Sequence, residues 1–256
     1  MANTGKRERN RAARHSQLMA AAGAIVAENG LEALTMQEVA QRVECAVGTI
    51  YTYFPSKSAL IAALQTEAIR KLAQSYENAA SGWDEAIEAM DLDEADAALA
   101  RMVAVGRLFV QWQVLQPREF EFLQMLSVAP GRVLEPHDIA SVLPSVLALF
   151  AEARVLHDLA AEAGAIESDL DRPGDDGYSR TVRWIAALDG AILVERATSN
   201  AIDALDPEAF NQTLMTERIT SDFLMAWGAP REAVAAAFRT ADEMFTRGLL
   251  FPEVIH

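Results

Sequence analysis

The stretch LEALTMQEVAQRVECAVGTIYTYFPSK, residues 31–57, contains two short helical patterns separated by a tight turn. Thr35 is a favourable N-cap residue, and Glu38, three residues later, completes a capping box that starts the first helix. The second helix covers about Ala46–Tyr53 and ends before Pro55, because a proline disfavours helical geometry in the residue that precedes it. This arrangement predicts a helix-turn-helix, in which the first helix braces the second against a DNA groove.

The second helix has two chemically different sides. A rotation of about 100° per residue places the apolar residues on one side with Ile50: Ala46, Val47 and Phe54. The opposite arc carries small and hydroxyl-bearing residues, which suit phosphates and base edges: Gly48, Thr49, Tyr51 and Thr52, with Tyr53 at the boundary. Lys57 lies beside the N-terminus of the next helix, and together they predict a phosphate site. An ordinary helical hairpin with surface tyrosines is the alternative interpretation.

The residues around this motif resemble the TetR family of transcriptional regulators. The resemblance covers about 50 residues, roughly 15–65, and these residues carry it: Gly30, Thr35, Val39, Ala40, the run Gly48–Lys57 apart from Thr52, and Leu60. The resemblance implies a homodimeric, all-helical repressor that binds double-stranded operator DNA and carries a variable C-terminal effector-binding domain. Position by position, it implies phosphate contacts at Thr35, Thr49, Tyr53 and Lys57. It implies groove-facing positions at Gln37, Val47, Gly48, Tyr51 and Thr52.

The turn departs from the family pattern at three positions. It has Val43 and Glu44 where the family often has Ala-Gly, and Ala46 stands where the family often has a serine cap. Loss of a side-chain cap costs about 0.5–2 kcal/mol, and Glu44 adds a negative charge near DNA. Cys45, also in the turn, is either a redox sensor or a buried inert thiol, and the second interpretation is favoured.

Charge is distributed unevenly along the chain, whose formal net charge is −15. Residues 1–71 hold nine Lys or Arg and six Asp or Glu, whereas the remainder holds 13 and 31. Within the first 14 residues, a single acid, Glu8, stands among the basic residues Lys6, Arg7, Arg9, Arg11 and Arg14. A basic N-terminal part followed by an acidic remainder indicates that the two parts of the chain have different partners. A solvated basic tail is the alternative.

The rest of the chain also reads as helical, because Ala, Leu, Glu, Arg and Met dominate and β-type alternation is absent. We expect a DNA-binding domain over residues 1–55 and a helical ligand-binding and dimerisation domain over 56–256. The expected helices are approximately 10–28, 35–43, 46–53, 56–80, 94–115, 117–128, 136–164, 179–199, 207–227 and 230–248. A loose connection with some helix is expected over 83–96, and Pro144 is expected to kink or split its helix.

Composition excludes several classes of protein. The single cysteine rules out an intrachain disulfide framework and a zinc finger. No uncharged apolar stretch reaches the roughly 18–20 residues that span a bilayer, and the N-terminus lacks the apolar region of a secretory signal. We therefore expect a cytoplasmic protein without a membrane partner.

Two roles remain for the C-terminal domain. Aromatic, thioether and imidazole side chains suit an apolar effector pocket, and the candidates are Phe109, Trp112, Phe120, Met125, Phe150, His157 and Trp184. Apolar rows on two late helices suit a four-helix dimer interface, and the candidates are Leu188, Ile192, Met215, Ile219 and Phe223. For any one of these side chains, ordinary core packing is the alternative. We expect an apolar or aromatic effector, with a cationic one as an open alternative, rather than a phosphorylated metabolite, since no glycine-rich phosphate cradle accompanies the basic residues.

The sequence offers little support for an enzyme. Nucleophile-elbow, zinc-protease, Walker and dinucleotide-binding motifs are absent, and the four histidines are far apart. The acidic run 169–177 lacks the ligand pattern of a calcium loop. We therefore expect no catalytic residues, no metal and no cofactor. A helical nucleoid-associated or interaction protein with the same DNA-binding head, but without an effector, is the alternative function.

Overall fold

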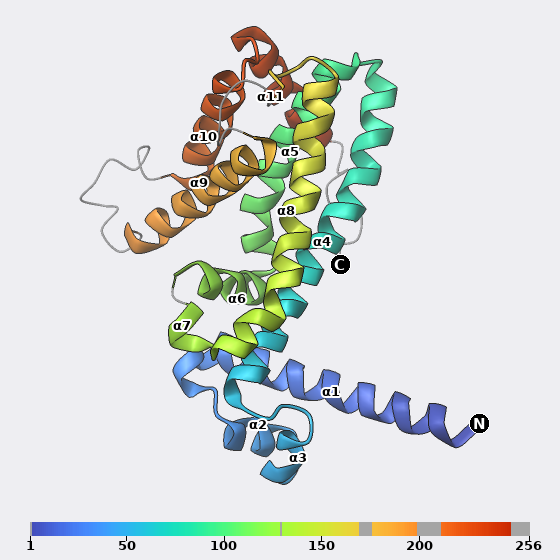
Figure 1. The fold of residues 1–256 in the computed structure, drawn as a ribbon, viewed down its shortest axis with the longest axis vertical. Coiled ribbons are helices and arrows are strands. Elements are labelled where there is room, and N and C mark those ends of the chain that lie inside the picture. The colour runs from blue at the N-terminus through green and yellow to red at the C-terminus, as the bar shows by residue number, and fades with distance from the viewer. Residues whose placement is uncertain (1, 129, 169–175, 199–210, 247–256) are drawn as a thin grey trace. The chain divides into compact units, whose positions relative to one another are not determined.

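The computed structural model describes residues 2–128, 130–168, 176–198 and 211–246. Every regular element in these ranges is a helix, which confirms the all-α prediction (Figure 1). The chain divides into two compact units. The N-terminal unit comprises residues 1–71 and 116–146, and the C-terminal unit comprises residues 72–115 and 147–256. The functional division at residue 55 stays a prediction.

The N-terminal unit is built around the helix-turn-helix. Its elements are α1 (Ala2–Asn29), the 3₁₀ helix η1 (Leu31–Ala33), α2 (Met36–Arg42), α3 (Val47–Tyr51), the first part of α4 (Lys57–Met90), α6 (Pro117–Val128), α7 (Pro130–Val133) and the start of α8 (Pro136–Glu162). The core combines apolar residues from successive helices, all fully buried: Leu18, Ile25, Leu34, Ile50 and Leu60. Helix α3 is therefore held by its one apolar face.

Helix α1 begins at Ala2, eight residues before the predicted start at Asn10. The Lys, Arg and Glu residues in this added part have good helix propensity, so the basic segment continues the helix. Side chains 6–13 are exposed. Figure 1 shows this half of α1 extending past α2 and α3.

Helix α4 continues to Met90 and the next helix begins at Glu94, so the connection predicted over 83–96 is limited to residues 91–93. Trp83, Ala86 and Ile87 form a buried stripe that extends the apolar face of the helix. The helix ends where Asp91 adopts a left-handed φ of 52°. The acidic residues of this segment had suggested a loose connection and made this stripe hard to recognise.

The C-terminal unit packs α5 (Glu94–Leu115), α9 (Gly177–Thr198), α10 (Gln212–Ala226) and α11 (Arg231–Thr246) with the ends of α4 and α8. Helices α5 and α6 have the predicted bounds. One core cluster includes Trp184, Leu188 and Trp227, and a second includes Trp83 and Met244. The predicted helix over 207–227 begins at Gln212, and its first positions lie outside the described residues.

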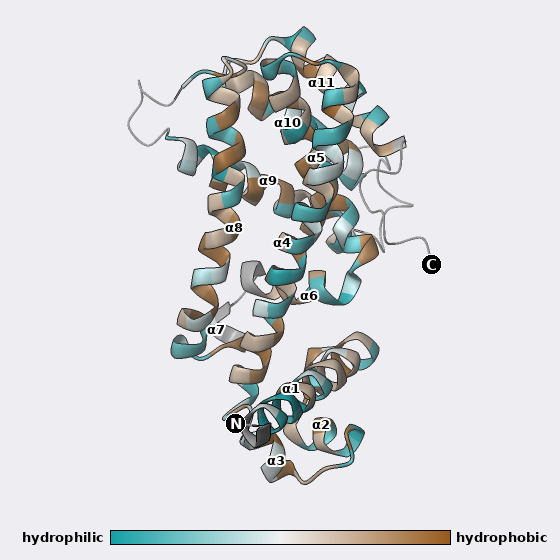
Figure 2. Ribbon diagram, turned by 90° about the vertical axis from the view of Figure 1, so that its right-hand side faces the viewer, coloured by the Kyte–Doolittle hydropathy of each residue, from teal (hydrophilic) through white to brown (hydrophobic). Residues whose placement is uncertain are grey.

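Helix α8 contains Pro144 and remains one helix, so it is not split, and the alternative of a kink at Pro144 stays a prediction. By length and composition alone, it is the one helix of the described segments that is apolar enough to cross a membrane. Figure 2 shows its apolar character. A long apolar helix of a water-soluble protein passes the same test. The first turn of α8 is fixed inside the N-terminal unit, where the buried Asp138 accepts a hydrogen bond from Ser58.

Candidate functional site

The first helix of the motif starts as predicted. Thr35 has extended backbone geometry, and its Oγ1 accepts a hydrogen bond of 3.0 Å from the Glu38 backbone N–H. This bond satisfies one of the amide groups that a helix N-terminus leaves without a partner. Gln37, in the first turn of α2, is exposed beside it.

Helix α3 presents its polar side outward. Ile50 and Phe54 are buried, whereas Tyr51 is 49% exposed, and Gly48 and Thr52 are exposed beside it. The remaining predicted contacts on or beside this helix are half-buried: Val47, Thr49 and Tyr53. Ala46 is exposed and precedes the helix as its N-cap, so its predicted place on the core side was wrong.

The turn between α2 and α3 is a Schellman-type C-cap centred on Glu44. The Cys45 N–H donates to the Ala40 carbonyl at 2.9 Å, and the Glu44 N–H donates to the Gln41 carbonyl at 3.1 Å. Glu44 has a φ of 52°, which glycine adopts at lower cost. Cys45 is half-buried rather than buried, which corrects the buried-thiol interpretation.

Lys57 occupies the first turn of α4. Its Nζ donates to the Leu31 backbone carbonyl at 3.4 Å, and its side chain is half-buried. Ser56 caps the same helix by accepting a 3.0 Å hydrogen bond from the Ala59 N–H. The ammonium group is therefore restrained beside a helix N-terminus. Its charge and the partial positive charge of the helix N-terminus both favour an anion such as a DNA phosphate.

Tertiary contacts that the sequence does not signal join α1 to the motif. Arg42, at the end of α2, donates to both carboxylate oxygens of Glu28 at 2.7 and 2.6 Å. The His15 ring lies 4.9 Å from the Phe54 ring, measured between centroids. These contacts orient the motif relative to α1, and they depend on residues 14 to 39 positions apart in the sequence.

The predicted effector residues belong to both units. Phe120 and Met125 lie in the N-terminal unit, and the other five lie in the C-terminal unit: Phe109, Trp112, Phe150, His157 and Trp184. Trp112, Phe120, His157 and Trp184 are almost completely buried. The Trp112 indole N–H donates to Ser75 Oγ at 3.1 Å, so this tryptophan is integrated into the fold.

An aromatic chain connects two of the predicted effector residues through Trp227, which the sequence had not suggested for this role. The Trp227 ring lies 5.4 Å from the His157 ring and 6.4 Å from the Trp184 ring. The Trp184 indole N–H donates to Thr220 Oγ1 at 3.3 Å. This chain is a buried region of the C-terminal unit that combines π surfaces with polar groups.

A polar cluster that the sequence had not revealed adjoins His157. Arg154 Nε donates to Asp158 Oδ1 at 2.6 Å, and His157 Nδ1 lies 3.5 Å from the same oxygen. Gly177, at the start of α9, faces the cluster so closely that a Cβ there would lie 2.5 Å from His157 Nδ1. A larger residue at position 177 would therefore displace the imidazole.

The predicted dimer residues divide into two groups. Leu188 and Ile192 are buried in the chain's own core and leave no side-chain surface for a partner, so their assignment was wrong. Met215, Ile219 and Phe223 on α10 are partly exposed. Ile219 and Phe223 also pack against the core of their own unit.

The comparisons with known proteins agree with this geometry. The family model described as bacterial regulatory proteins, tetR family, matches residues 18–64. We call these matched residues, 18–64, the TetR-family segment. This TetR-family segment includes α2, α3 and the start of α4, together with most of the predicted DNA contacts.

Relatives of the TetR-family segment are transcriptional repressors. Over 70 residues the chain is 41% identical to the HTH-type transcriptional repressor KstR of Mycobacterium tuberculosis, covering 27% of this chain and 32% of KstR. Over 55 residues it is 44% identical to KstR of Rhodococcus jostii, covering 21% of this chain and 26% of that protein. The matches thus span a third or less of the length of these curated relatives.

Solved structures extend the likeness of fold beyond the TetR-family segment. A Rhodococcus sp. RHA1 protein of unknown function has a TM-score of 0.56 at 17% identity, covering 83% of this chain and 94% of that chain. RolR, solved in complex with resorcinol, has a TM-score of 0.55 at 18% identity, covering 91% of this chain and 96% of RolR. At these identities, the likeness concerns the fold.

Proposed function

We propose that this chain is a cytoplasmic, homodimeric repressor of transcription that releases operator DNA when a small apolar or aromatic effector binds. The observation that carries the DNA-binding part is the outward face of α3, where Gly48, Tyr51 and Thr52 are exposed opposite the buried Ile50. In a helix-turn-helix this face enters the major groove. The remaining proposed DNA contacts flank this face: Thr35, Gln37, Val47, Thr49, Tyr53 and Lys57.

The proposed dimer surface is the outer face of α10. Leu214 is 48% exposed there, and Arg218 and Asp222 are exposed four residues apart. Across a two-fold axis, one surface patch contacts the same patch of the other copy. Arg218 would then face the partner subunit's Asp222, and Leu214 would add apolar area.

Three variants test this dimer surface by sedimentation velocity. Leu214→Glu and Arg218→Asp should each weaken the dimer, because they place unpaired charge in the interface. Combining Arg218→Asp with Asp222→Arg should restore it, since the opposite charges again face each other. A charge reversal that leaves dimerisation unchanged would place the interface elsewhere.

The proposed effector site is the buried aromatic region of the C-terminal unit around His157, Trp184 and Trp227. Resorcinol, the ligand in the RolR structure, is a small aromatic molecule, which supports this class of effector. His157 and Trp184 are buried, so a ligand reaches them only if local packing opens. Trp112, Phe109 and Phe150 remain proposed contacts in the same unit.

The proposed function is tested with the chain's own upstream DNA. Fluorescence anisotropy with labelled duplexes should show preferential binding over a shuffled sequence of equal length, and the Tyr51→Ala variant should lose that preference. Resorcinol and catechol, added separately, should lower DNA affinity if an aromatic effector acts as proposed. A nucleoid-associated protein would instead bind both duplexes equally and respond to neither compound.

A further inference from the structure

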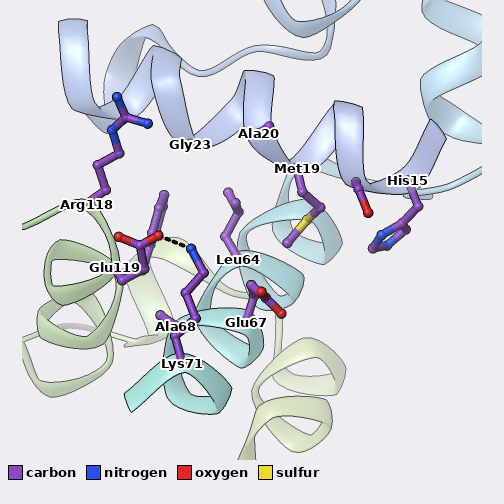
Figure 3. A pocket seen from close by; sticks show the side chains of 12 residues that line it. His15, Met19, Ala20, Gly23, Leu64, Glu67, Ala68, Lys71, Arg118 and Glu119 are labelled. Carbon is purple, nitrogen blue, oxygen red and sulfur yellow. Dashed lines mark hydrogen bonds and ion pairs between the residues drawn. The ribbon is translucent and has the colours of Figure 1, made fainter. Parts of the chain in front are cut away.

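A pocket of about 320 Å³ lies within the N-terminal unit, between α1, α4 and α6 (Figure 3). It is separate from the outward face of α3 and from the aromatic region of the C-terminal unit. Residues on one face of each helix line it, among them His15, Met19, Leu64, Lys71, Arg118 and Phe122. Its walls combine apolar side chains with charged ones.

Both carboxylates that line the pocket already have cationic partners. Glu119 forms an ion pair with Lys71, drawn as a dashed line in Figure 3. Glu67 accepts two hydrogen bonds from Arg70, at 2.9 and 2.8 Å. The hydrogen bonds from Arg70 lower the pKa of Glu67, which keeps it ionised and paired. A cationic ligand would have to compete with these internal partners.

Hydrogen-bond donors, in contrast, remain available. Arg118 lines the pocket and has no ion-pair or hydrogen-bond partner within the part of the chain that the structure describes. It lies in the first turn of α6, where the helix dipole also favours negative charge. Ser16 and His15 contribute a hydroxyl and an imidazole from α1. The polar groups that the pocket offers to a ligand thus include one cation, Arg118, and two further side chains that can donate a hydrogen bond, Ser16 and His15.

The apolar part of the lining determines the rest of the ligand. Leu64 and Phe122 are buried, and Met19 is half-buried beside them. We propose that this pocket binds a small monocarboxylate with an aromatic or aliphatic body, with the carboxylate on Arg118 and the body against these three side chains. A single unpaired guanidinium suits one carboxylate, and a phosphorylated ligand would bring more negative charge than the pocket balances.

Such a ligand would act directly on the DNA-binding unit. It would bridge α1 to α4 and α6, and it would contact His15, whose ring packs on Phe54 at the end of the motif. This site is additional to the effector site proposed in the C-terminal unit.

Isothermal titration of the full chain with 3-phenylpropionate and hexanoate, each compared with its neutral amide, tests the proposal. We expect each carboxylate to bind at least tenfold more tightly than its amide, a difference of about 1.4 kcal/mol. Arg118→Gln should abolish this preference. Arg239→Gln, which removes an exposed arginine of the C-terminal unit, serves as the matched control and should preserve it.

A second set of variants fills the pocket. A Cβ at Gly23 would have Leu64 Cδ2 as its nearest neighbour at 4.0 Å, so Gly23→Leu directs a side chain into the space. It should abolish binding, as should Ala20→Leu from an exposed position, which serves if the first variant does not fold. Gly131→Leu, at an open glycine of the same unit, should bind like the wild type. The proposal is overturned if neither carboxylate binds, if acid and amide bind equally, or if the Arg118 and filling variants retain binding.

Discussion

The guanidinium of Arg11 lies over the ring of Tyr53, with its central carbon 5.9 Å from the ring centroid. This contact orients the N-terminal half of α1 relative to the helix-turn-helix. Arg7, Arg11 and Arg14 are spaced four and three residues apart, so they share one side of the helix. Because Arg11 on that side contacts Tyr53, we expect the basic segment to extend the proposed DNA-binding surface.

Arg11→Gln should weaken binding to all DNA sequences to a similar extent. Each lost phosphate contact reduces the slope of log K against log[salt] by about 0.9, and salt titrations of binding measure this slope. Arg183→Gln, in the C-terminal unit, is the control and should leave the slope unchanged. An unchanged slope in the Arg11 variant would mean that the basic segment does not contact phosphates.

Glu44→Gly should stabilise the protein by about 1 kcal/mol, because glycine adopts the left-handed backbone at lower cost than a residue with a Cβ. Urea unfolding measures the change. Glu44→Gln keeps the backbone cost but removes the charge, so it should increase DNA affinity at low salt without the gain in stability. Equal stability of the two variants would contradict the role of the backbone.

Lys57 and Tyr51 should have separable roles in DNA binding. Lys57→Ala should lower affinity for all DNA sequences about equally. It should also reduce the slope of log K against log[salt] by about 0.9, the contribution of one phosphate contact. Tyr51→Phe should instead change which duplex sequence is preferred, because the exposed Tyr51 side chain is a proposed groove contact and this variant removes its hydroxyl. Binding assays over a randomised duplex pool distinguish the two effects. A change of sequence preference in the Lys57 variant, with an unchanged slope, would reverse these assignments.

The raised pKa of Tyr76 should make the free energy of unfolding fall at alkaline pH. Burial is the main reason that its pKa is raised, and the nearby carboxylates of Glu152 and Asp84 raise it further. The folded state therefore holds the phenol proton more tightly than the unfolded chain does. Its contribution to stability is complete below the unfolded pKa of about 10 and is lost as pH rises through the folded pKa.

Tyr76→Phe should accordingly have a shallower loss of unfolding free energy above pH 10 than the wild type. Urea unfolding from pH 8 to pH 11 gives the comparison, and Tyr178→Phe, at an exposed position, is its control. Parallel curves for the wild type and the Tyr76 variant would show that Tyr76 has the same pKa in both states.

Trp112 tests the effector domain. Its truncation to alanine would cost about 3–5 kcal/mol, because the side chain is fully buried, so Trp112→Phe is the better variant. It removes the indole N–H that bonds Ser75 while keeping a ring. We expect reduced release of DNA by an aromatic effector and normal effector-free DNA binding. Normal release would remove Trp112 from the effector site.

Local chemistry made the motif predictable. The Thr35 cap, the proline after α3 and the single apolar side through Ile50 each act over a few residues, and all appear in the structure. Helix extents were less predictable where charge concealed helical packing, as in α4 around Trp83. The pairing of Glu28 with Arg42 depends on tertiary geometry, and the sequence has no signal for it.

Aromatic candidates in the C-terminal domain were harder to assign, because a buried aromatic side chain has the same pattern in a core and in a pocket. Leu188 and Ile192 show the same ambiguity for an interface and a core, which burial resolves. Gly177 beside His157 is a close contact between separate helices, and composition does not reveal it.

The most direct test of the central claim is a hydroxyl-radical footprint of the full chain on its own upstream DNA. We expect two protected half-sites related by a pseudo-two-fold axis, with protection extended outward by the basic half of α1 and shortened in the Arg11→Gln variant. Uniform protection without discrete half-sites, or none at concentrations that saturate non-specific DNA, would contradict sequence-specific binding by a dimer.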